Sequence, residues 1–119
     1  MTEQDINIIQ EPYILPDATS MKVHSVMNEN VDNLVSVFKV LSDPVRIRIL
    51  KALQITELCV CVLVETTDYK HSALSYHLKL LKDADLVDSR RDKNFQIYYL
   101  TETGDKLLRS IDSSFKKGI

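Results

Sequence analysis

Glycine is scarce in this 119-residue chain, which holds only Gly104 and Gly118. So few glycines leave no glycine-rich loop of the kind whose backbone N–H groups cradle phosphates. The sequence also offers no visible arrangement of a nucleophile beside a general base. We therefore expect a protein that is not an enzyme and that needs no organic cofactor.

Long apolar runs and a secretory start are also missing. No hydrophobic stretch approaches the roughly 18 residues that a membrane-spanning helix needs. The first twelve residues, MTEQDINIIQEP, are acidic and lack the basic start and apolar centre of a signal peptide. We therefore expect a cytoplasmic protein without a membrane partner, in a compartment where thiols stay reduced.

Cysteine is equally scarce, but both cysteines lie in one short segment. Cys59 and Cys61 are one residue apart in the apolar run ELCVCVLVE, residues 57–65. In a reducing compartment, a Cys-x-Cys pair is more typical of a metal or reactive site than of a structural disulfide. Composition alone leaves a second interpretation open, in which both cysteines are small buried hydrophobes.

Charge is unevenly distributed along the chain, although the net charge is only −2. Residues 1–43 carry two lysines and seven acidic residues, a net charge of −5. Residues 70–93 carry six basic and four acidic residues, a net charge of +2. A basic segment in an acidic protein is a weak indication of a nucleic-acid contact, because the local field matters more than the total.

Pro12 and Pro16 mark the start of the chain as an arm, because its apolar residues follow no sustained period. We expect residues 1–28 to be a flexible arm and residues 29–119 to form one domain. Within that domain, helical spacing of apolar residues begins at Val31. It predicts four successive helices, over residues 31–41, 44–53, 57–65 and 72–84.

Polar residues between these segments predict where the helices begin. Ser42 or Asp43 caps the second helix, and Pro44 takes its first position. Thr56 is the expected cap of the third helix. Arg46 is expected to point toward water, on the polar side of the second helix.

The period changes in the segment LVDSRRDKNFQIYYL, which begins at Leu86. It predicts two strands joined at residues 92–94, with Asn94 in a left-handed turn conformation. Thr101 then opens a last helix that ends at Gly118. The predicted fold class is mainly α with a small β-hairpin (α+β), a winged helix-turn-helix in the order α-α-α-α-β-β-α. Residues 29–119 would then bind DNA and dimerise.

The helix over 72–84 and the hairpin supply the candidate DNA contacts. Leucines form the inner stripe of that helix, which leaves polar side chains on its opposite face. The candidates for hydrogen bonds to base edges or phosphates are Lys70, His71, Ser72, Ser75, Tyr76, Lys79, Arg90, Arg91 and Lys93. A solvated helix face, and a charged hairpin tip that prevents edge pairing, remain the alternatives.

The last helix and the helix over residues 31–41 carry more apolar surface than a small core needs. We assign the apolar face of the last helix to a homodimer seam, with packing inside the chain as the alternative. Its residues are Leu107, Leu108, Ile111 and Phe115. A symmetric dimer would bind a pseudo-palindromic operator in double-stranded DNA.

Four segments resemble, in order and spacing, the ArsR/SmtB family of metal-sensing transcriptional repressors over about residues 31–110. They are VFKVLSDPVRIRILKAL, ELCVCVL, HSALSYHLKLLKDADLV and NFQIYYLT. The resemblance implies a homodimeric winged-helix repressor that binds operator DNA without metal and releases it, with transcription of resistance genes, when metal binds. The motif Glu-Leu-Cys-Val-Cys-Asp-Leu of its thiolate sites is matched by residues 57–63, except that Val62 replaces Asp.

The resemblance also narrows the type of site. Cadmium and lead sites of the family add N-terminal cysteines, which this arm lacks. The zinc-type site of the last helix uses Asp and His, whereas the matching positions here are Glu102, Gly104, Phe115 and Gly118. The resemblance therefore implies an arsenical-resistance repressor whose inducer is As(III) or Sb(III).

Thiol chemistry agrees with a soft ion at Cys59 and Cys61. As(III) favours three sulfur ligands, so two cysteines leave a position that a small thiol such as glutathione, or another oxygen or nitrogen donor, could fill. Residues i and i+2 of a helix point about 200° apart, whereas two sulfurs on one ion lie within about 4 Å. We therefore expect ion binding to distort the helix over 57–65 and to move the helix that follows.

Three other interpretations stay open at this point. The same winged helix could respond to Cd(II) or Pb(II). It could also respond to oxidation of the cysteine pair, as a redox switch. A thiol enzyme or metal carrier that binds no DNA is a third class, and failure to bind any upstream DNA would favour it.

Overall fold

The computed structural model describes residues 12–115. The chain divides between Val31 and Asp32 into two units. In the first unit, α2 (Asp17–Met27) forms a helix that has no buried residue. The sequence pattern of the arm predicted no helix here, whereas residues 17–27 are helical; the flexibility of the arm stays a prediction. Periodicity gave no signal because the apolar side chains of α2 do not gather on one face and stay exposed.

The second unit follows the predicted order of helices and strands, with one addition. Its elements are α3 (Asp32–Leu41), α4 (Pro44–Ile55), β1 (Leu58–Cys59), α5 (Val60–Thr66), α6 (His71–Asp83), β2 (Val87–Asp92), β3 (Phe95–Leu100) and α7 (Glu102–Ser114). The predicted winged helix-turn-helix, mainly α with a β-hairpin, is therefore confirmed. The addition is β1, which joins the hairpin in an antiparallel sheet of order β1-β3-β2.

Side-chain caps begin α4 and α7 as the sequence predicts. Asp43 accepts hydrogen bonds from the N–H groups of Val45 (2.8 Å) and Arg46 (3.3 Å), and proline fills the first position of α4. At α7, Thr101 Oγ1 accepts from the N–H of Gly104 at 3.0 Å. Such caps satisfy amide groups that have no partner inside the helix. The described part of α7 ends at Ser114, and the predicted end at Gly118 lies outside the described residues.

The prediction for residues 57–65 is wrong at the start of that segment. Leu58 and Cys59 are extended and pair with Tyr98 and Ile97 of β3, so the helix begins only at Val60. Thr56, the expected cap, instead ends α4. A two-residue strand has no measurable period, and its partner lies almost forty positions away. Only the tertiary pairing with β3 makes this segment a strand.

The hairpin closes through a shorter loop than expected. Asp92 pairs with Phe95, which leaves Lys93 and Asn94 as its two loop residues. Lys93 adopts the left-handed conformation with φ 57°, so the assignment of that conformation to Asn94 is wrong. Both residues lie where the chain reverses, and it is the first of the two that takes the positive φ there.

Leucines of α4 and α6 form the centre of the core. Leu50, Leu78 and Leu81 are fully buried, as the leucine stripe of α6 predicts. Arg46, by contrast, does not point toward water. Its guanidinium donates to the carbonyl of Val40 (2.9 Å) and to His77 Nδ1 (3.1 Å). Through these hydrogen bonds, the side chain of Arg46 links α4 to the end of α3 and to α6.

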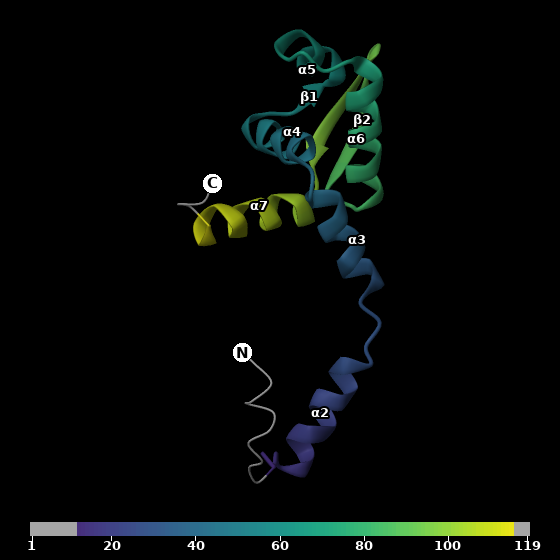
Figure 1. The fold of residues 1–119 in the computed structure, drawn as a ribbon. Coiled ribbons are helices and arrows are strands. Elements are labelled where there is room, and N and C mark those ends of the chain that lie inside the picture. Colours follow the sequence, from purple (N-terminus) through teal and green to yellow (C-terminus); the bar gives the residue numbers. More distant parts are fainter. Residues whose placement is uncertain (1–11, 116–119) are drawn as a thin grey trace. The chain divides into compact units, whose positions relative to one another are not determined.

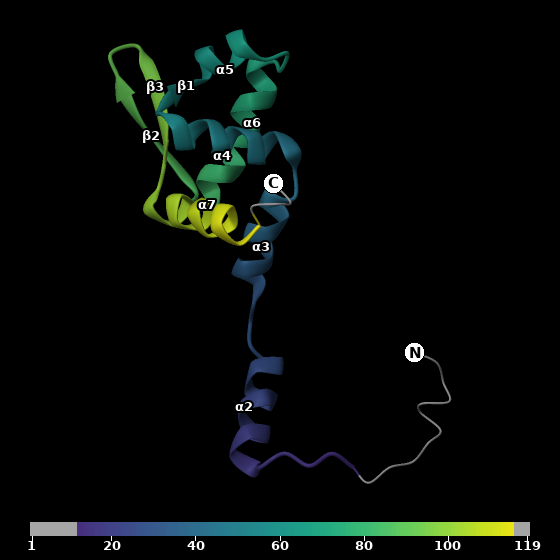
Figure 2. The ribbon, with the colours of Figure 1, turned by 90° about the vertical axis from the view of Figure 1, so that its left-hand side faces the viewer.

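The second unit has different secondary-structure elements at its two ends (Figure 1). The short helix α5 and the tip of the hairpin lie at one end, and α3 and α7 lie at the other. A quarter turn of the view gives the same arrangement (Figure 2). α6 packs against both α5 and β2, so it connects the two ends. Among residues 12–115, no helix is long and apolar enough to cross a membrane.

Candidate functional site

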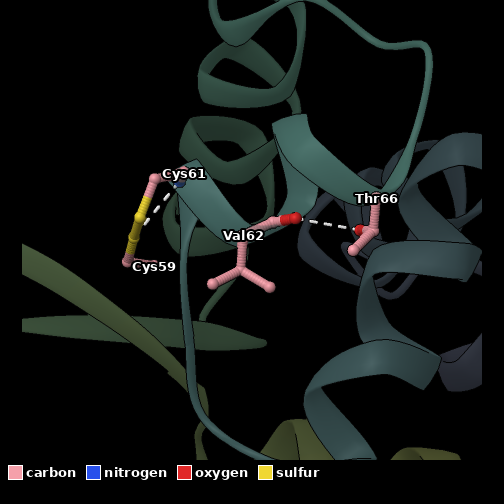
Figure 3. The surroundings of a disulfide bond; sticks show 4 residues. All are labelled: Cys59, Cys61, Val62 and Thr66. Carbon is pink, nitrogen blue, oxygen red and sulfur yellow. Dashed lines mark hydrogen bonds between the residues drawn. A yellow bond between two sulfur atoms is a disulfide. The ribbon is translucent and has the colours of Figure 1, made fainter.

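The two cysteines stand on either side of the junction between β1 and α5. Cys59 is the buried last residue of β1, whereas Cys61 is exposed in the first turn of α5. Their Cα atoms are 5.3 Å apart and their sulfurs are joined in a disulfide (Figure 3). The expectation that the two side chains point about 200° apart is therefore wrong. It assumed that both residues lie in one helix, but the backbone of Cys59 is extended, with φ −90° and ψ 158°.

Cys59 also caps α5. The N–H of Cys61 donates a hydrogen bond to Cys59 Sγ at 3.2 Å. A side-chain acceptor in this position satisfies one of the helix's first amide groups. The sulfurs thus converge while α5 keeps its helical form, so binding of one ion by both does not require this turn to unwind. The expected distortion of the helix is not supported by this geometry.

A cavity of about 310 Å³ opens beside the cysteine pair. It is bordered by Cys59, Val60 and Cys61, by His71 and Ser75 from the first turns of α6, and by Arg91, Asn94, Phe95, Gln96 and Tyr98 of the hairpin. Val62 does not border it, and its side chain lies away from the sulfurs in Figure 3. Two elements that the sequence assigns to DNA contact therefore face the same space as both thiols.

The donors around the pair suit a soft ion of low coordination number. Among the described residues, no group of three or more His, Cys, Asp or Glu side chains could hold a metal ion. Within residues 12–115, the two sulfurs are therefore not joined by a third or fourth His, Cys, Asp or Glu ligand. A closed zinc site takes four protein ligands, whereas a thiophilic ion with three ligands needs only one more donor.

The positions of the family's zinc-type site on α7 have other neighbours. Glu102 pairs with Lys106 at 3.2 Å on the exposed side of the helix. Gly104 lies so close to Leu86 that an added Cβ would collide with the carbonyl oxygen of that residue. A ligand side chain at position 104 would therefore not fit. Phe115 follows the last residue of α7, and Gly118 lies outside the described residues.

The polar face of α6 presents most of the residues predicted to contact DNA. Lys70, His71, Ser72, Tyr76 and Lys79 are exposed, opposite the buried leucines.

Four of the polar side chains near this face have partners within the chain. Lys79 forms an ion pair with Asp83 at 3.0 Å. His71 Nδ1 lies 3.3 Å from the hydroxyl of Ser75, which is half-buried. His77 instead accepts a hydrogen bond from Arg46, so its side chain makes a contact inside the domain.

The three cations of the hairpin differ in their surroundings. Arg90 Nη2 lies 2.6 Å from Glu57 Oε1, and its guanidinium stands 5.6 Å from the centre of the Tyr99 ring. The hydrogen bond from Arg90 holds the pKa of Glu57 below its ordinary value, and Glu57 in turn raises the pKa of Arg90. Arg91 and Lys93 are exposed and form no ion pair within the described residues.

Sequence reasoning missed the Glu57–Arg90 pair. Both residues stood out for other reasons, Glu57 as part of the cysteine motif and Arg90 as a candidate phosphate contact. Opposite charges 33 positions apart carry no local signal that they meet. The pairing of β1 with β3 would have indicated it, but β1 itself was not predicted.

The apolar face assigned to the dimer seam is only partly available. Leu108 is buried in the domain's own core, so its assignment to the seam is wrong. Leu107 packs against that core, Ile111 is half-buried, and Phe115 is exposed. The exposed apolar surface at this end belongs mainly to α3. Its large exposed side chains are Leu34, Val35 and Phe38.

Comparison with known proteins gives a family match over the central part of the chain. The model described as "Bacterial regulatory protein, arsR family" matches residues 43–89. The "Arsenical resistance operon repressor" of Staphylococcus xylosus is 43% identical over 67 residues, which are 56% of this chain and 64% of that protein. The chain thus spans slightly less than two thirds of this relative. A "Cadmium resistance transcriptional regulatory protein CadC homolog" of Staphylococcus aureus is 30% identical over 97 residues, 81% of this chain and 80% of that protein.

Solved structures of similar fold include two mycobacterial proteins. M. tuberculosis Rv0081 is 32% identical, with a TM-score of 0.65 over 76% of this chain and 93% of its own. Mb0332 from Mycobacterium bovis, described as a homodimeric winged helix-turn-helix DNA-binding domain, has a TM-score of 0.68 at 23% identity, over 87% of this chain and 90% of its own. At that identity, Mb0332 supports the fold alone.

Proposed function

The chain belongs to the ArsR family of bacterial regulatory proteins, and from that membership we propose that it is a transcriptional repressor released from operator DNA by a thiophilic ion. The observation that carries the proposal is the convergence of Cys59 and Cys61 beside the first turn of α6 and the hairpin. An ion at that junction touches both elements that a winged helix uses to contact DNA. Catalysis has no part in this function.

We propose As(III) or Sb(III) as the inducer. Thiolates select soft ions, and the described residues provide two sulfurs without a third or fourth ligand. The relative named as an arsenical resistance repressor is 43% identical over 67 residues, and the cadmium regulator homologue is 30% identical over 97 residues. Cd(II) and Pb(II) form the alternative, and they would need further donors from outside the described residues.

The route from the thiols to the DNA-contacting elements is short. Cys59 pairs with Ile97 of β3, and Cys61 lies in α5, which packs on α6. When bound, an ion supplies a rigid link between the two sulfurs. Cys59 and Cys61 must then adopt the spacing that this link demands, and β3 and α6 follow through their contacts. Ion and DNA thus oppose each other, and the coupling is the same in both directions.

The proposed repressor acts as a homodimer on a pseudo-palindromic site. Two winged helices related by a two-fold axis place their α6 helices about 34 to 36 Å apart, one turn of DNA, or a multiple of it. The proposed seam is the apolar side of α3 together with Ile111 of α7 and Phe115, which follows α7, since α3 and α7 lie at the end opposite the hairpin tip.

Fluorescence anisotropy on the DNA upstream of the protein's own gene tests the proposal. Reduced protein is bound to the labelled duplex and titrated with As(III), Sb(III), Cd(II), Pb(II) and Zn(II). We expect release by As(III) and Sb(III), and no release from the Cys59→Ser, Cys61→Ser double variant. Release of that double variant by As(III) would place the sensing site elsewhere.

Oxidation is a second candidate signal, favoured by the disulfide between Cys59 and Cys61. Hydrogen peroxide would take two electrons and the two thiol protons from the pair, which yields the disulfide and two molecules of water. An anaerobic titration of the reduced protein–DNA complex separates the two signals. Release by arsenite without oxidant supports the ion, and release by peroxide alone supports the redox switch.

A further inference from the structure

We propose that the cavity beside Cys59 and Cys61 binds a small thiol that carries carboxylates, and that this thiol supplies the third sulfur to the inducing ion. The inference rests on the proposed function, because it concerns the same cysteine pair. It adds a second ligand class to the site, with its own binding residues in α6 and in the hairpin.

The chemistry at the pair leaves one position for such a thiol. Arsenous acid exchanges its hydroxyl groups for sulfur, and each thiol proton leaves with a hydroxyl as water. Three As–S bonds therefore replace three As–O bonds with no change of oxidation state. Cys59 and Cys61 account for two of these bonds. Since no further Cys lies in the chain, the third sulfur has to come from another molecule.

The cavity has the size and the position for this molecule. Its volume of about 310 Å³ lies at the low end of the range for small-molecule pockets. Both sulfur-bearing residues border it, so a thiol inside it would present its sulfur to an ion held by the pair. Asn94, Gln96 and Tyr98 line the hairpin side and carry hydrogen-bonding groups that suit a peptide-like ligand, although the Gln96 amide N–H group already donates to Ser89 Oγ.

The charge around the cavity favours an anion. Arg91 and His71 border it, and none of its bordering residues in the described chain is an aspartate or glutamate. Arg91 has no ion-pair partner within residues 12–115, whereas its neighbour Arg90 is bound by Glu57. An unpartnered guanidinium beside a cavity is suited to a carboxylate, which it can bind through two parallel hydrogen bonds.

The first turn of α6 also favours an anion at the edge of the cavity. Its N-cap residue, Lys70, makes no side-chain hydrogen bond to the helix, so the first amide N–H groups have no side-chain cap. His71 and Ser75 bring this turn to the edge of the cavity. Together with Arg91, the amide groups and the positive end of the helix dipole favour negative charge at this edge.

The inference changes how the inducer would act on DNA. Arg91 and His71 are also candidates for phosphate contacts, and a bound carboxylate would occupy the same side chains. An anionic thiol would therefore compete directly with the DNA backbone, in addition to any rearrangement transmitted through β1 and α5.

The experiment measures ion binding without DNA. As(III) is titrated into the reduced protein with an excess of glutathione or of glutathione diethyl ester, which has the same thiol but blocked carboxylates. The increase in ultraviolet absorption of the arsenic–thiolate bonds reports binding. We expect wild-type protein to bind As(III) about tenfold more tightly with glutathione than with the ester. The ratio should fall toward one in Arg91→Gln and stay near ten in Lys93→Gln, a cation of the same hairpin that does not border the cavity.

The outcomes separate this inference from the proposed function. Equal affinity with the two thiols, or a ratio unchanged by Arg91→Gln, overturns the carboxylate-binding subsite while ion binding by the cysteines stands. Binding of As(III) that survives in the Cys59→Ser, Cys61→Ser double variant overturns both.

Discussion

Arg90 and Glu57, 33 positions apart in sequence, form an ion pair with 2.6 Å between Nη2 and Oε1. Glu57 immediately precedes β1, which contains Cys59, and Arg90 lies in β2 of the hairpin. The pairing of β1 with β3 joins the same two regions through the backbone. The hairpin therefore contacts the cysteine segment in two ways. One is the exposed Glu57–Arg90 ion pair, and the other is the backbone pairing of β1 with β3.

The Glu57–Arg90 pair predicts a pH dependence of stability. Because the pKa of Glu57 is depressed in the folded protein, the pair stabilises the fold above the carboxyl's unfolded pKa. That contribution is lost as the pH falls through the folded pKa. We expect the difference in Tm between wild type and Glu57→Gln to be largest near neutral pH and to vanish in acid, below the folded pKa. Thermal unfolding followed by circular dichroism across this range is the measurement, and a constant difference would contradict the assignment.

The hairpin cations should contribute unequally to DNA binding. Lys93, exposed at the hairpin tip, should release a counterion on contact with a phosphate, so Lys93→Gln should reduce the slope of log K against log salt by about 0.9 per protomer. Arg90→Gln should change the slope by less than half as much, because Glu57 already holds that guanidinium. Anisotropy titrations at several salt concentrations give both slopes. Equal reductions would show that Arg90 leaves Glu57 when DNA binds.

The exposed side of α3 should be required for dimerisation. Phe38 is 59% exposed in the protomer, so Phe38→Asp should leave the fold intact. It should raise the dimer dissociation constant about thirtyfold or more, as expected for an aromatic anchor at the centre of an interface. Sedimentation equilibrium over a range of concentrations measures this constant. Ile55→Asp is the control, since Ile55 is 85% exposed on α4, and its dimer should be unaffected.

Gly104 should be indispensable for the packing of α7. An added Cβ would meet the carbonyl oxygen of Leu86, which also accepts a hydrogen bond from the N–H of Thr101 at 3.1 Å. Gly104→Ala should therefore lower the free energy of unfolding by about 1–3 kcal/mol, the usual cost of overpacking. Urea denaturation measures it. Thr103→Ala, one position away and exposed, should leave stability within about 0.5 kcal/mol of wild type.

The parts of this fold that could be predicted are those determined by residues close together in the sequence. The leucine stripe of α6 and the caps at Asp43 and Thr101 depend on residues within one or two turns of each other, so spacing and residue type were enough. The polar face of α6 followed from the same periodicity.

The parts that could not be predicted depend on contacts between distant residues. β1 exists because Leu58 and Cys59 pair with β3, and Arg46 turns inward because His77 and the carbonyl of Val40 accept its hydrogen bonds. The error at β1 had the largest effect on the candidate site. By placing Cys59 inside a helix, it reversed the expected direction of the side chain, and the extended backbone of Cys59 removes the geometric reason for expecting ion binding to unwind the turn.

The cap formed by Cys59 constrains any redesign of the proposed sensor for another ion. Whatever residue stands at position 59 must be extended to pair with Ile97 and must accept a hydrogen bond from the N–H of Cys61. Aspartate, asparagine, serine and threonine meet the second requirement, whereas a replacement without a capping group leaves that amide without its acceptor. Position 61 is exposed, and its residue neither pairs with β3 nor caps α5. Engineering of ion selectivity is therefore asymmetric: new donor chemistry can enter at position 61, while position 59 accepts only residues that still begin α5.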